Sequence, residues 1–209
     1  MDLLLIRHAE CEGNVNGAPV AEDWPLTPRG RQQAEALALR LVCEAVRPDH
    51  IFSSPMLRAL QTTDILARGL GVTFQVMTDL AEVSLADCEG LSVAEAEKRF
   101  PGLSLESPEQ SAQRWRFPGG ESLKELRERG RRAIASLVAL RQRGARVVAA
   151  VSHGAVLSQG LAGYLGAPPS PYTQFSWDNT AIARLVLADG RPAKLALLND
   201  TRHLDELEG

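Results

Sequence analysis

Cysteine and long hydrophobic runs are both scarce in this sequence of 209 residues. Cys11, Cys43 and Cys88 are widely spaced and form no C-x-x-C pair, which is typical of reduced thiols in a cytoplasmic protein. No apolar run approaches the length of about 18 residues that a membrane-spanning helix needs. The first apolar run ends at Ile6 with no basic residue before it, unlike a secretory leader. We therefore expect a cytoplasmic protein with no membrane partner.

Excess positive charge is also missing. Lys and Arg number 23 against 26 Asp and Glu, so a nucleic-acid partner is not expected. The sequence contains no G-x-x-x-x-G-K-[ST] loop, no G-x-G-x-x-G fingerprint and no H-E-x-x-H or Cys/His cluster. We therefore expect no nucleotide cofactor and no metal.

What the sequence does contain is enough apolar residues, 44%, for one large core. Short apolar segments without alternation are separated by helical patterns, which predicts a mainly parallel sheet covered on both faces. Strands are expected at 2–6, 50–53, 72–77, 146–151, 181–187 and 194–198, the last two joined by an Asp189-Gly190 turn. The prediction is a three-layer α/β/α sandwich with one antiparallel strand. It forms a single domain, 1–209, with a flap at about 92–121.

Helix-start signals divide the same chain. Thr27 and Ser54 each precede a proline and are expected to cap helices over 28–47 and about 55–68. Capping boxes at 92–95 and 122–125 predict a short helix ending near Phe100 and a longer one reaching about Gln142, and a last helix is expected over 154–165. The charge-rich stretch 125–132 is interpreted as a solvated helix face.

Polar residues follow four of the predicted strands, at the sheet edge where α/β proteins bind ligands. They include two histidines, two arginines and one glutamate: Arg7, His8, Arg58, Glu82 and His153. Arginine offers a planar fork to phosphate oxygens, neutral imidazole can act as a nucleophile, and a carboxyl group can act as a general acid. This set is adequate for metal-independent phosphoryl transfer through a phosphohistidine.

Six segments then resemble, in order, the motifs of the histidine phosphatase (phosphoglycerate mutase-like) superfamily. They are LIRHAECEGN (5–14), WPLTPRGRQQA (24–34), SSPMLRALQTT (53–63), LAEVSLADCEG (80–90), PGGES (118–122) and VSHG (151–154). The resemblance covers nearly the whole chain and favours the phosphatase branch.

The resemblance implies a role for each matching residue. His8 would be the nucleophile, and Glu82 would protonate the leaving group. The phosphoryl oxygens would be bound by Arg7, Asn14, Arg58, His153 and Gly154. The sequence departs from the family pattern at three positions: Ala9 and Ala86 stand where glycine is usual, and Cys88 replaces an aromatic residue. These changes leave the chemical groups intact but bear on the local backbone and the pocket wall.

Two other classes of function remain as alternatives. The segment 150–154 differs from a G-x-S-x-G elbow only at Ala150, with Ser152 at the serine position. Asp178 or Asp200 with His203 would complete a serine hydrolase triad. That interpretation leaves Arg7 and Glu82 without a task. A binding module that has lost catalysis is disfavoured because no core residue of the motifs is lost.

The partner is expected to be a small phosphorylated metabolite whose identity the sequence does not name, and a homodimer is left open. Arg114, Trp115 and Arg116 in the flap are candidates for contacting the rest of the substrate. The stretch 92–120 is short and lacks the clustered arginine pair of the longer mutases. This favours hydrolysis over phosphoglycerate mutase-type transfer.

Overall fold

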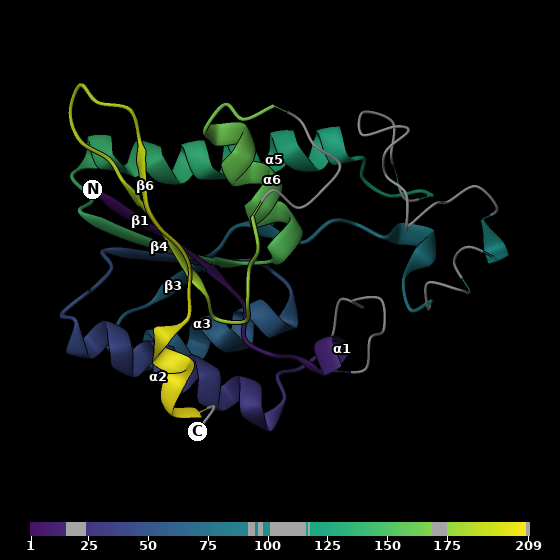
Figure 1. The fold of residues 1–209 in the computed structure, drawn as a ribbon, viewed down its shortest axis with the longest axis horizontal. Coiled ribbons are helices and arrows are strands. Elements are labelled where there is room, and N and C mark those ends of the chain that lie inside the picture. The colour runs from purple at the N-terminus through teal and green to yellow at the C-terminus, as the bar shows by residue number, and fades with distance from the viewer. Residues whose placement is uncertain are drawn as a thin grey trace.

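A computed structural model describes residues 1–15, 24–91, 95, 98–100, 116, 118–168 and 175–207. Strands and helices alternate along most of the chain (Figure 1). The strands are β1 (Asp2–Arg7), β2 (His50–Ser53), β3 (Phe74–Val76), β4 (Val147–Ser152), β5 (Ile182–Val186) and β6 (Lys194–Asp200). The α-helices are α1 (Glu12–Val15), α2 (Pro28–Cys43), α3 (Leu57–Leu70), α5 (Leu123–Ala139) and α6 (Gly154–Tyr164). Short 3-10 helices are η1 (Thr78–Leu80), η2 (Ala86–Cys88), η4 (Leu140–Arg143) and η5 (Arg202–Leu207).

The six strands form one sheet in the order β3-β2-β4-β1-β5-β6. β1, β2, β3 and β4 pair in parallel, whereas β5 is antiparallel to both of its neighbours, β1 and β6. The predicted α/β fold with one antiparallel strand is therefore confirmed. β1 lies in the interior of the sheet, so its carboxyl end emerges among other strand ends.

Both faces of the sheet are covered by helices. α5 and α6 lie on one face, and α2, α3 and η5 lie on the other (Figure 1). Successive residues of β1 serve the two layers in turn: Leu3 and Leu5 belong to the core under α5 and α6, and Leu4 and Ile6 to the core under α2 and α3. This two-sided burial is the reason that the central strands are continuously apolar.

Two of the predicted helix starts are confirmed. The Thr27 hydroxyl accepts a hydrogen bond from Gly30 N, with Pro28 at the first helical position of α2. Ser122 and Glu125 form a reciprocal capping box that begins α5. Both caps satisfy backbone N–H groups that have no partner within the helix.

The predicted start and end of α3 were wrong. The helix begins at Leu57 with Met56 as its cap residue, and the Ser54 hydroxyl contacts the His153 ring as well as Met56 N. It continues through Gly69, whose lack of a side chain accommodates Ala38 of α2, and ends at the left-handed Gly71. β3 is also shorter than predicted.

α5 and α6 meet at a close backbone contact. A Cβ added at Gly130 would lie 2.8 Å from Gly160 Cα, and one added at Gly160 would lie 2.7 Å from the Gly130 carbonyl carbon. Larger residues would force the helices apart, so the two glycines fix how α5 sits on α6.

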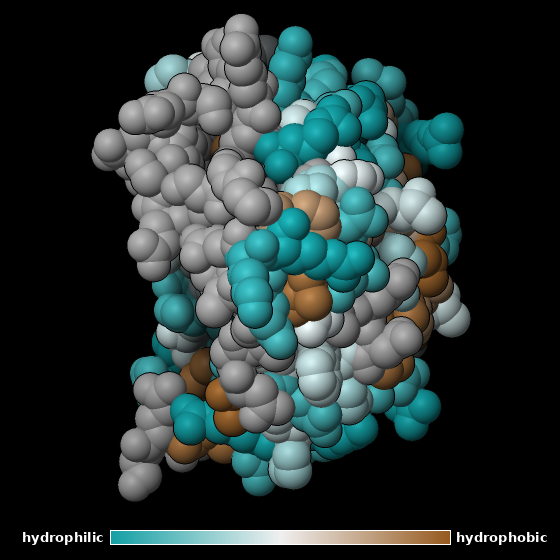
Figure 2. Space-filling view, turned by 90° about the vertical axis from the view of Figure 1, so that its right-hand side faces the viewer, coloured by the Kyte–Doolittle hydropathy of each residue, from teal (hydrophilic) through white to brown (hydrophobic). Residues whose placement is uncertain are grey.

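On the molecular face toward which the carboxyl end of β1 runs, the described residues are mainly hydrophilic, with small apolar patches between them (Figure 2). Within the described ranges, no helix is long and apolar enough to cross a membrane. More than half of the stretch 92–100, where a short helix was predicted, and most of the flap lie outside the described residues. The single-domain division of the chain stays a prediction.

Candidate active site

The strand ends bring the predicted residues to one cavity of about 290 Å³. Its lining consists of Arg7, His8, Asn14, Arg58, Glu82, Gly154, Ala155 and Trp177. Six of these eight residues carry predicted roles, and His153 lies directly behind them with its ring centroid 5.0 Å from that of His8. Ala155 and Trp177 were not singled out from the sequence.

The hydrogen bonds of His8 define which ring nitrogen is free to react. Nδ1 lies 2.7 Å from the Ala9 carbonyl oxygen, which can only accept, so Nδ1 carries the proton. Arg58 Nε donates to Nε2 of His8 at 3.3 Å, which requires a lone pair on that atom. Nε2 therefore carries the lone pair of the neutral ring.

His153 has a complementary arrangement. Its Nδ1 accepts a hydrogen bond from the same Arg58 Nε at 3.2 Å, so Nε2 carries the proton and donates to the Ser54 hydroxyl oxygen at 2.7 Å. Ser54 thus orients this histidine instead of capping α3. Arg58 lies between the two imidazoles and is completely buried.

Burial and neighbouring positive charge keep both histidines neutral. Burial is the main cause that lowers the pKa of His8 well below its ordinary value, and the charges of Arg58 and Arg7 add to it. The pKa of His153 is lowered for the same first reason, with further contributions from His8 and Arg58. Since only the neutral imidazole has a lone pair, the environment favours the nucleophilic form.

Arg7 carries a donor that is free in this structure. Its Nη1 donates to the Trp177 carbonyl oxygen at 2.5 Å, whereas its buried Nε–H has no partner among the described residues. An unsatisfied buried donor costs free energy unless a ligand accepts from it. Burial lowers the pKa of both Arg7 and Arg58, although guanidinium groups remain charged in proteins. The cavity therefore has a cationic wall suited to an anion.

The main chain of His8 is fixed by the loop before β5. Thr180 N and the Asn179 side chain both donate to the His8 carbonyl oxygen, at 3.3 and 3.0 Å. Thr180 has a left-handed φ of 59°, a costly conformation for a β-branched residue. Asn179 also donates to Asn14 Oδ1, which accepts from Cys11 as well. Because the side-chain oxygen of Asn14 already accepts from these groups, its side-chain NH₂ group remains as a donor for a ligand.

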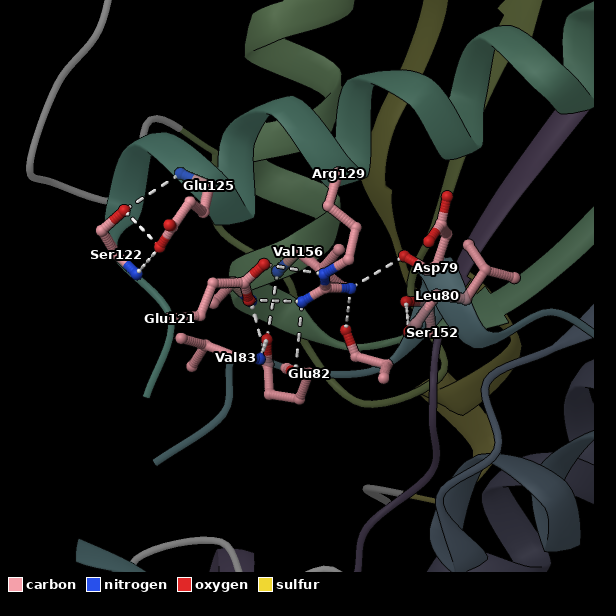
Figure 3. Close-up of polar contacts among 12 residues, drawn as sticks. Asp79, Leu80, Glu82, Val83, Glu121, Ser122, Glu125, Arg129, Ser152 and Val156 are labelled. Atoms are coloured by element: carbon pink, nitrogen blue, oxygen red, sulfur yellow. Dashed lines mark hydrogen bonds and ion pairs between the residues drawn. The ribbon is translucent and has the colours of Figure 1, made fainter. Parts of the chain in front are cut away.

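Glu82 enters the cavity from a loop that is neither helix nor strand. Its Oε1 accepts from Val83 N and Val156 N at 2.9 and 3.1 Å, and its Oε2 accepts from Ala155 N at 3.2 Å. The last two N–H groups belong to the first turn of α6. The predicted acid is thus anchored on the cavity wall (Figure 3).

The serine hydrolase alternative is not supported by the geometry. Ser152 is fully buried, and its hydroxyl donates to the Leu80 carbonyl oxygen. His203 contacts Thr180 and Arg40 and does not line the cavity. The three predicted triad members are therefore not brought together. No group of three His, Cys, Asp or Glu that could hold a metal occurs among the described residues.

The flap candidates have separate outcomes. Arg114 and Trp115 lie outside the described residues. Arg116 is exposed and forms a bidentate ion pair with Glu125 at the start of α5, and it does not line the cavity. Its substrate contact stays a prediction that would require this pair to open.

The family departures are accommodated locally. Ala9 is completely buried at an ordinary negative φ, and its N–H donates to the Thr62 hydroxyl. Ala86 has a φ of 40°, in the region that favours glycine, so the backbone at this position keeps a glycine-like conformation. Cys88 is buried among the partly buried apolar residues of a small cluster that includes Val83 and Phe100.

The interpretation of the 125–132 stretch as a solvated face was wrong for Arg129. Its side chain is only 15% exposed and contacts the loop that carries Glu82. Helical periodicity places Arg129 three residues after Leu126 and four before Ala133, both of which are buried, and this signal could have identified it. Trp177 left no comparable signal in its local sequence.

The cavity thus brings together a neutral imidazole, a carboxyl group and two arginines, a set that suits an enzyme acting on phosphoryl groups. The model of the histidine phosphatase superfamily (branch 1) matches residues 3–201. The chain belongs to this superfamily, as the six motifs predicted.

Two curated relatives differ in how much of their length aligns with this chain. A probable phosphoglycerate mutase from Salmonella paratyphi C is 30% identical over 98% of this chain and 95% of its own length. A 6-phosphofructo-2-kinase/fructose-2,6-bisphosphatase from Gallus gallus is 32% identical over 61% of this chain, and the match spans only 26% of that protein.

Solved structures are similar over nearly the whole chain. A phosphoserine phosphatase mutant from Entamoeba histolytica, in complex with phosphoserine, has a TM-score of 0.76 and 28% identity and covers 97% of this chain and 98% of its own. An alpha-ribazole phosphatase from Shigella flexneri has a TM-score of 0.83 and 26% identity, with 96% and 97% covered. Family membership and these neighbours support an enzyme of the phosphatase class.

Proposed function

We propose that this protein hydrolyses a small phosphomonoester through a phosphohistidine formed on His8 Nε2. The observation that carries the proposal is the pairing of two features at one cavity. A neutral His8 offers a lone pair on Nε2, and the buried Nε–H of Arg7 has no partner among the described residues. The first is a nucleophile and the second is a donor suited to the oxygen of an entering phosphoryl group.

In the first step, the Nε2 lone pair forms a bond to phosphorus while the ester P–O bond breaks. The leaving oxygen keeps the electron pair of that bond and takes a proton from Glu82. Arg7, Arg58 and the Asn14 amide stabilise the charge on the three equatorial oxygens. The proton on His8 Nδ1 stays on that nitrogen and is donated to the Ala9 carbonyl oxygen in a hydrogen bond, so the ring carries a positive charge only while it is phosphorylated.

In the second step, water attacks the phosphorus and the N–P bond breaks. Glu82, deprotonated in the first step, takes a proton from that water. Inorganic phosphate leaves, and the electron pair of the broken bond returns to Nε2. Arg7 and Arg58 bind the phosphoryl oxygens in both steps. They supply the positive charge that metals provide in other phosphoryl transfer sites. The proposed cycle therefore needs no metal.

The substrate class rests on the neighbours. Several structures that match nearly the whole chain are named as phosphatases of small compounds, phosphoserine in one case and alpha-ribazole in another. We assign this protein a compound of that size. Phosphoglycerate mutase activity is the second candidate, because a relative carrying that name matches 98% of the chain.

The test is to trap the intermediate. Rapid quenching with a ³²P-labelled monoester in EDTA should give an acid-labile, base-stable phosphoenzyme, and His8→Ala should lower kcat on the order of 10⁴-fold or more. His50→Ala is the matched control, since His50 is the first residue of β2, at the opposite end from its catalytic edge. An acid-stable label, or full activity in His8→Ala, would refute the nucleophile.

Hydrolysis is separated from transfer by one further assay. With 3-phosphoglycerate and catalytic 2,3-bisphosphoglycerate, we expect slow release of inorganic phosphate and little 2-phosphoglycerate. Rapid isomerisation with negligible phosphate release would establish the mutase alternative instead.

A further inference from the structure

The loop that presents Glu82 has no regular secondary structure of its own. Residues 81–85 form neither helix nor strand and follow the single turn of η1. The first turn of α6 fixes the Glu82 carboxylate, as described above, but these contacts do not fix the main chain that carries it. A side chain on a flexible loop would not hold a proton in a productive position.

Arg129 of α5 supplies the missing main-chain contacts. Its Nη1 donates to the carbonyl oxygens of Asp79 and Ala81 at 2.8 and 2.7 Å, and its Nη2 donates to the Glu82 carbonyl oxygen at 3.3 Å. These three acceptors lie within four consecutive residues. One guanidinium group therefore fixes the main chain at Glu82 and over the three residues before it (Figure 3).

Glu121 orients this guanidinium group. Its Oε1 accepts from Arg129 Nε at 2.8 Å, and its Oε2 accepts from Nη2 at 2.6 Å. With the three carbonyl contacts, all five N–H donors of Arg129 have an acceptor. Both side chains are 15% exposed, so solvent screens the pair only weakly. The planar fork is needed for this pattern, because a lysine could not make these contacts from one point charge.

The contact between α5 and α6 fixes the position of Arg129 relative to the Glu82 carboxylate. Gly130, the next residue, packs against Gly160 of α6. The helix that holds the Glu82 main chain and the helix that holds its carboxylate are thus fixed to each other. Glu121 N also donates to the Ser84 carbonyl oxygen, which adds a second attachment to the same loop.

We infer that Arg129, oriented by Glu121, is a positioning residue that holds Glu82 where it can transfer a proton to the leaving group. The inference rests on the proposed role of Glu82 as the general acid. A purely structural ion pair would predict a different result. Its loss would lower stability and reduce the turnover of every substrate by a similar factor.

The decisive experiment combines leaving groups with a double-mutant cycle. Wild type, Glu82→Gln, Arg129→Lys and the double variant are assayed on an alkyl phosphate and on p-nitrophenyl phosphate, whose leaving group needs little protonation. Glu82→Gln should lower kcat roughly 10²–10⁴-fold on the alkyl ester and much less on the aryl ester. Arg129→Lys should follow the same pattern with about 10²-fold on the alkyl ester.

In the double variant, Arg129→Lys should add little to the loss already caused by Glu82→Gln. Arg131→Lys is the matched control, since Arg131 lies on the same helix in an exposed pair with Glu128, and it should leave both rates unchanged. Thermal unfolding of each variant reports any loss of stability. If Arg129→Lys does not fold, Glu121→Gln replaces it, with a smaller loss and the same leaving-group dependence expected.

The outcomes separate the two proposals. Equal losses on both esters in Arg129→Lys, or losses that multiply in the double variant, overturn the positioning role while the acid role of Glu82 stands. Equal losses on both esters in Glu82→Gln overturn the general-acid role and the positioning role with it. The phosphohistidine on His8 is tested independently by the trapped label.

Discussion

The two halves of the candidate active site are built differently. His8 directly follows an interior strand, and its main chain is paired on both sides, from His8 N to the Ser152 carbonyl oxygen and from Thr180 N to the His8 carbonyl oxygen. Glu82 lies in a loop at the rim and depends on side chains and helix ends contributed by α5 and α6. We call these the nucleophile side and the acid side.

The difference has a functional logic. In the proposed cycle, the nucleophile side stabilises charge that is common to all phosphomonoesters, and its two histidines directly follow β1 and β4. The acid side would meet the leaving group, which differs between substrates, and contacts with α5 and α6 determine its geometry. Loops on a rigid scaffold are where binding properties vary most readily. Variants on the two sides should therefore differ in how their effects depend on the leaving group.

The largest effect is expected from Arg58, at the centre of the nucleophile side. Arg58→Ala removes the donor shared by both histidines and a fixed positive charge, and kcat/KM should fall roughly 10³-fold or more. Because the transition-state charge is the same for every ester, alkyl and aryl phosphates should lose activity equally. Arg68→Ala, on the exposed face of the same helix, is the control and should be near wild type. A loss of activity confined to alkyl phosphates would contradict the proposed difference between the two sides.

A change of pH is expected to have an effect of intermediate size, on the free energy of unfolding. In the unfolded chain a histidine takes up a proton near pH 6.5, whereas His8 and His153 stay neutral in the folded protein to well below that value. The unfolded state therefore binds more protons in the window below pH 6.5, and the free energy of unfolding should fall as the pH drops. The slope is about 1.4 kcal/mol per pH unit for each such histidine. His203, whose pKa burial lowers to about 4, acts in the same direction.

Chemical denaturation at pH 7, 6 and 5 measures this slope. The acid limb of kcat/KM should likewise lie below pH 6.5, since His8 keeps its lone pair there. A free energy of unfolding that stays constant between pH 6.5 and 5 would contradict the neutral, buried state of the nucleophile side.

The smallest effect on activity is expected from substituting Trp177, a buried residue that lines the cavity. Its indole N–H has no partner among the described residues, and a bound substrate could accept from it. Trp177→Phe should raise KM about fivefold, the worth of one hydrogen bond of about 1 kcal/mol. The matched control is Trp24→Phe, because the Trp24 indole N–H is also buried without a described partner but does not line the cavity. An equal change of KM in both variants would show that the Trp177 indole N–H does not contact the substrate.

Much of this architecture could be predicted because its causes are local. The apolar residues of β1, the Thr27 cap and the Ser122 capping box act within a few residues of chain. Strand ends were then enough to group His8, Arg58 and His153, since parallel strands deliver their carboxyl ends to one edge. Ser54 was misassigned because the same hydroxyl can cap a helix or accept from a distant imidazole, and local sequence does not distinguish the two.

The sequence alone determined the fold class, the family and the chemical groups of the nucleophile side, because periodicity, caps and motif order depend on neighbouring residues. Only the tertiary structure decided which nitrogen of His8 is free, how Glu82 is held and what Arg129 contacts. Arg129 and the carbonyl groups that it binds are separated by 47 to 50 residues, and their meeting depends on how α5 packs on α6. A charged residue on a helix looks solvated in sequence, and it is the packing of that helix that buries it against a loop.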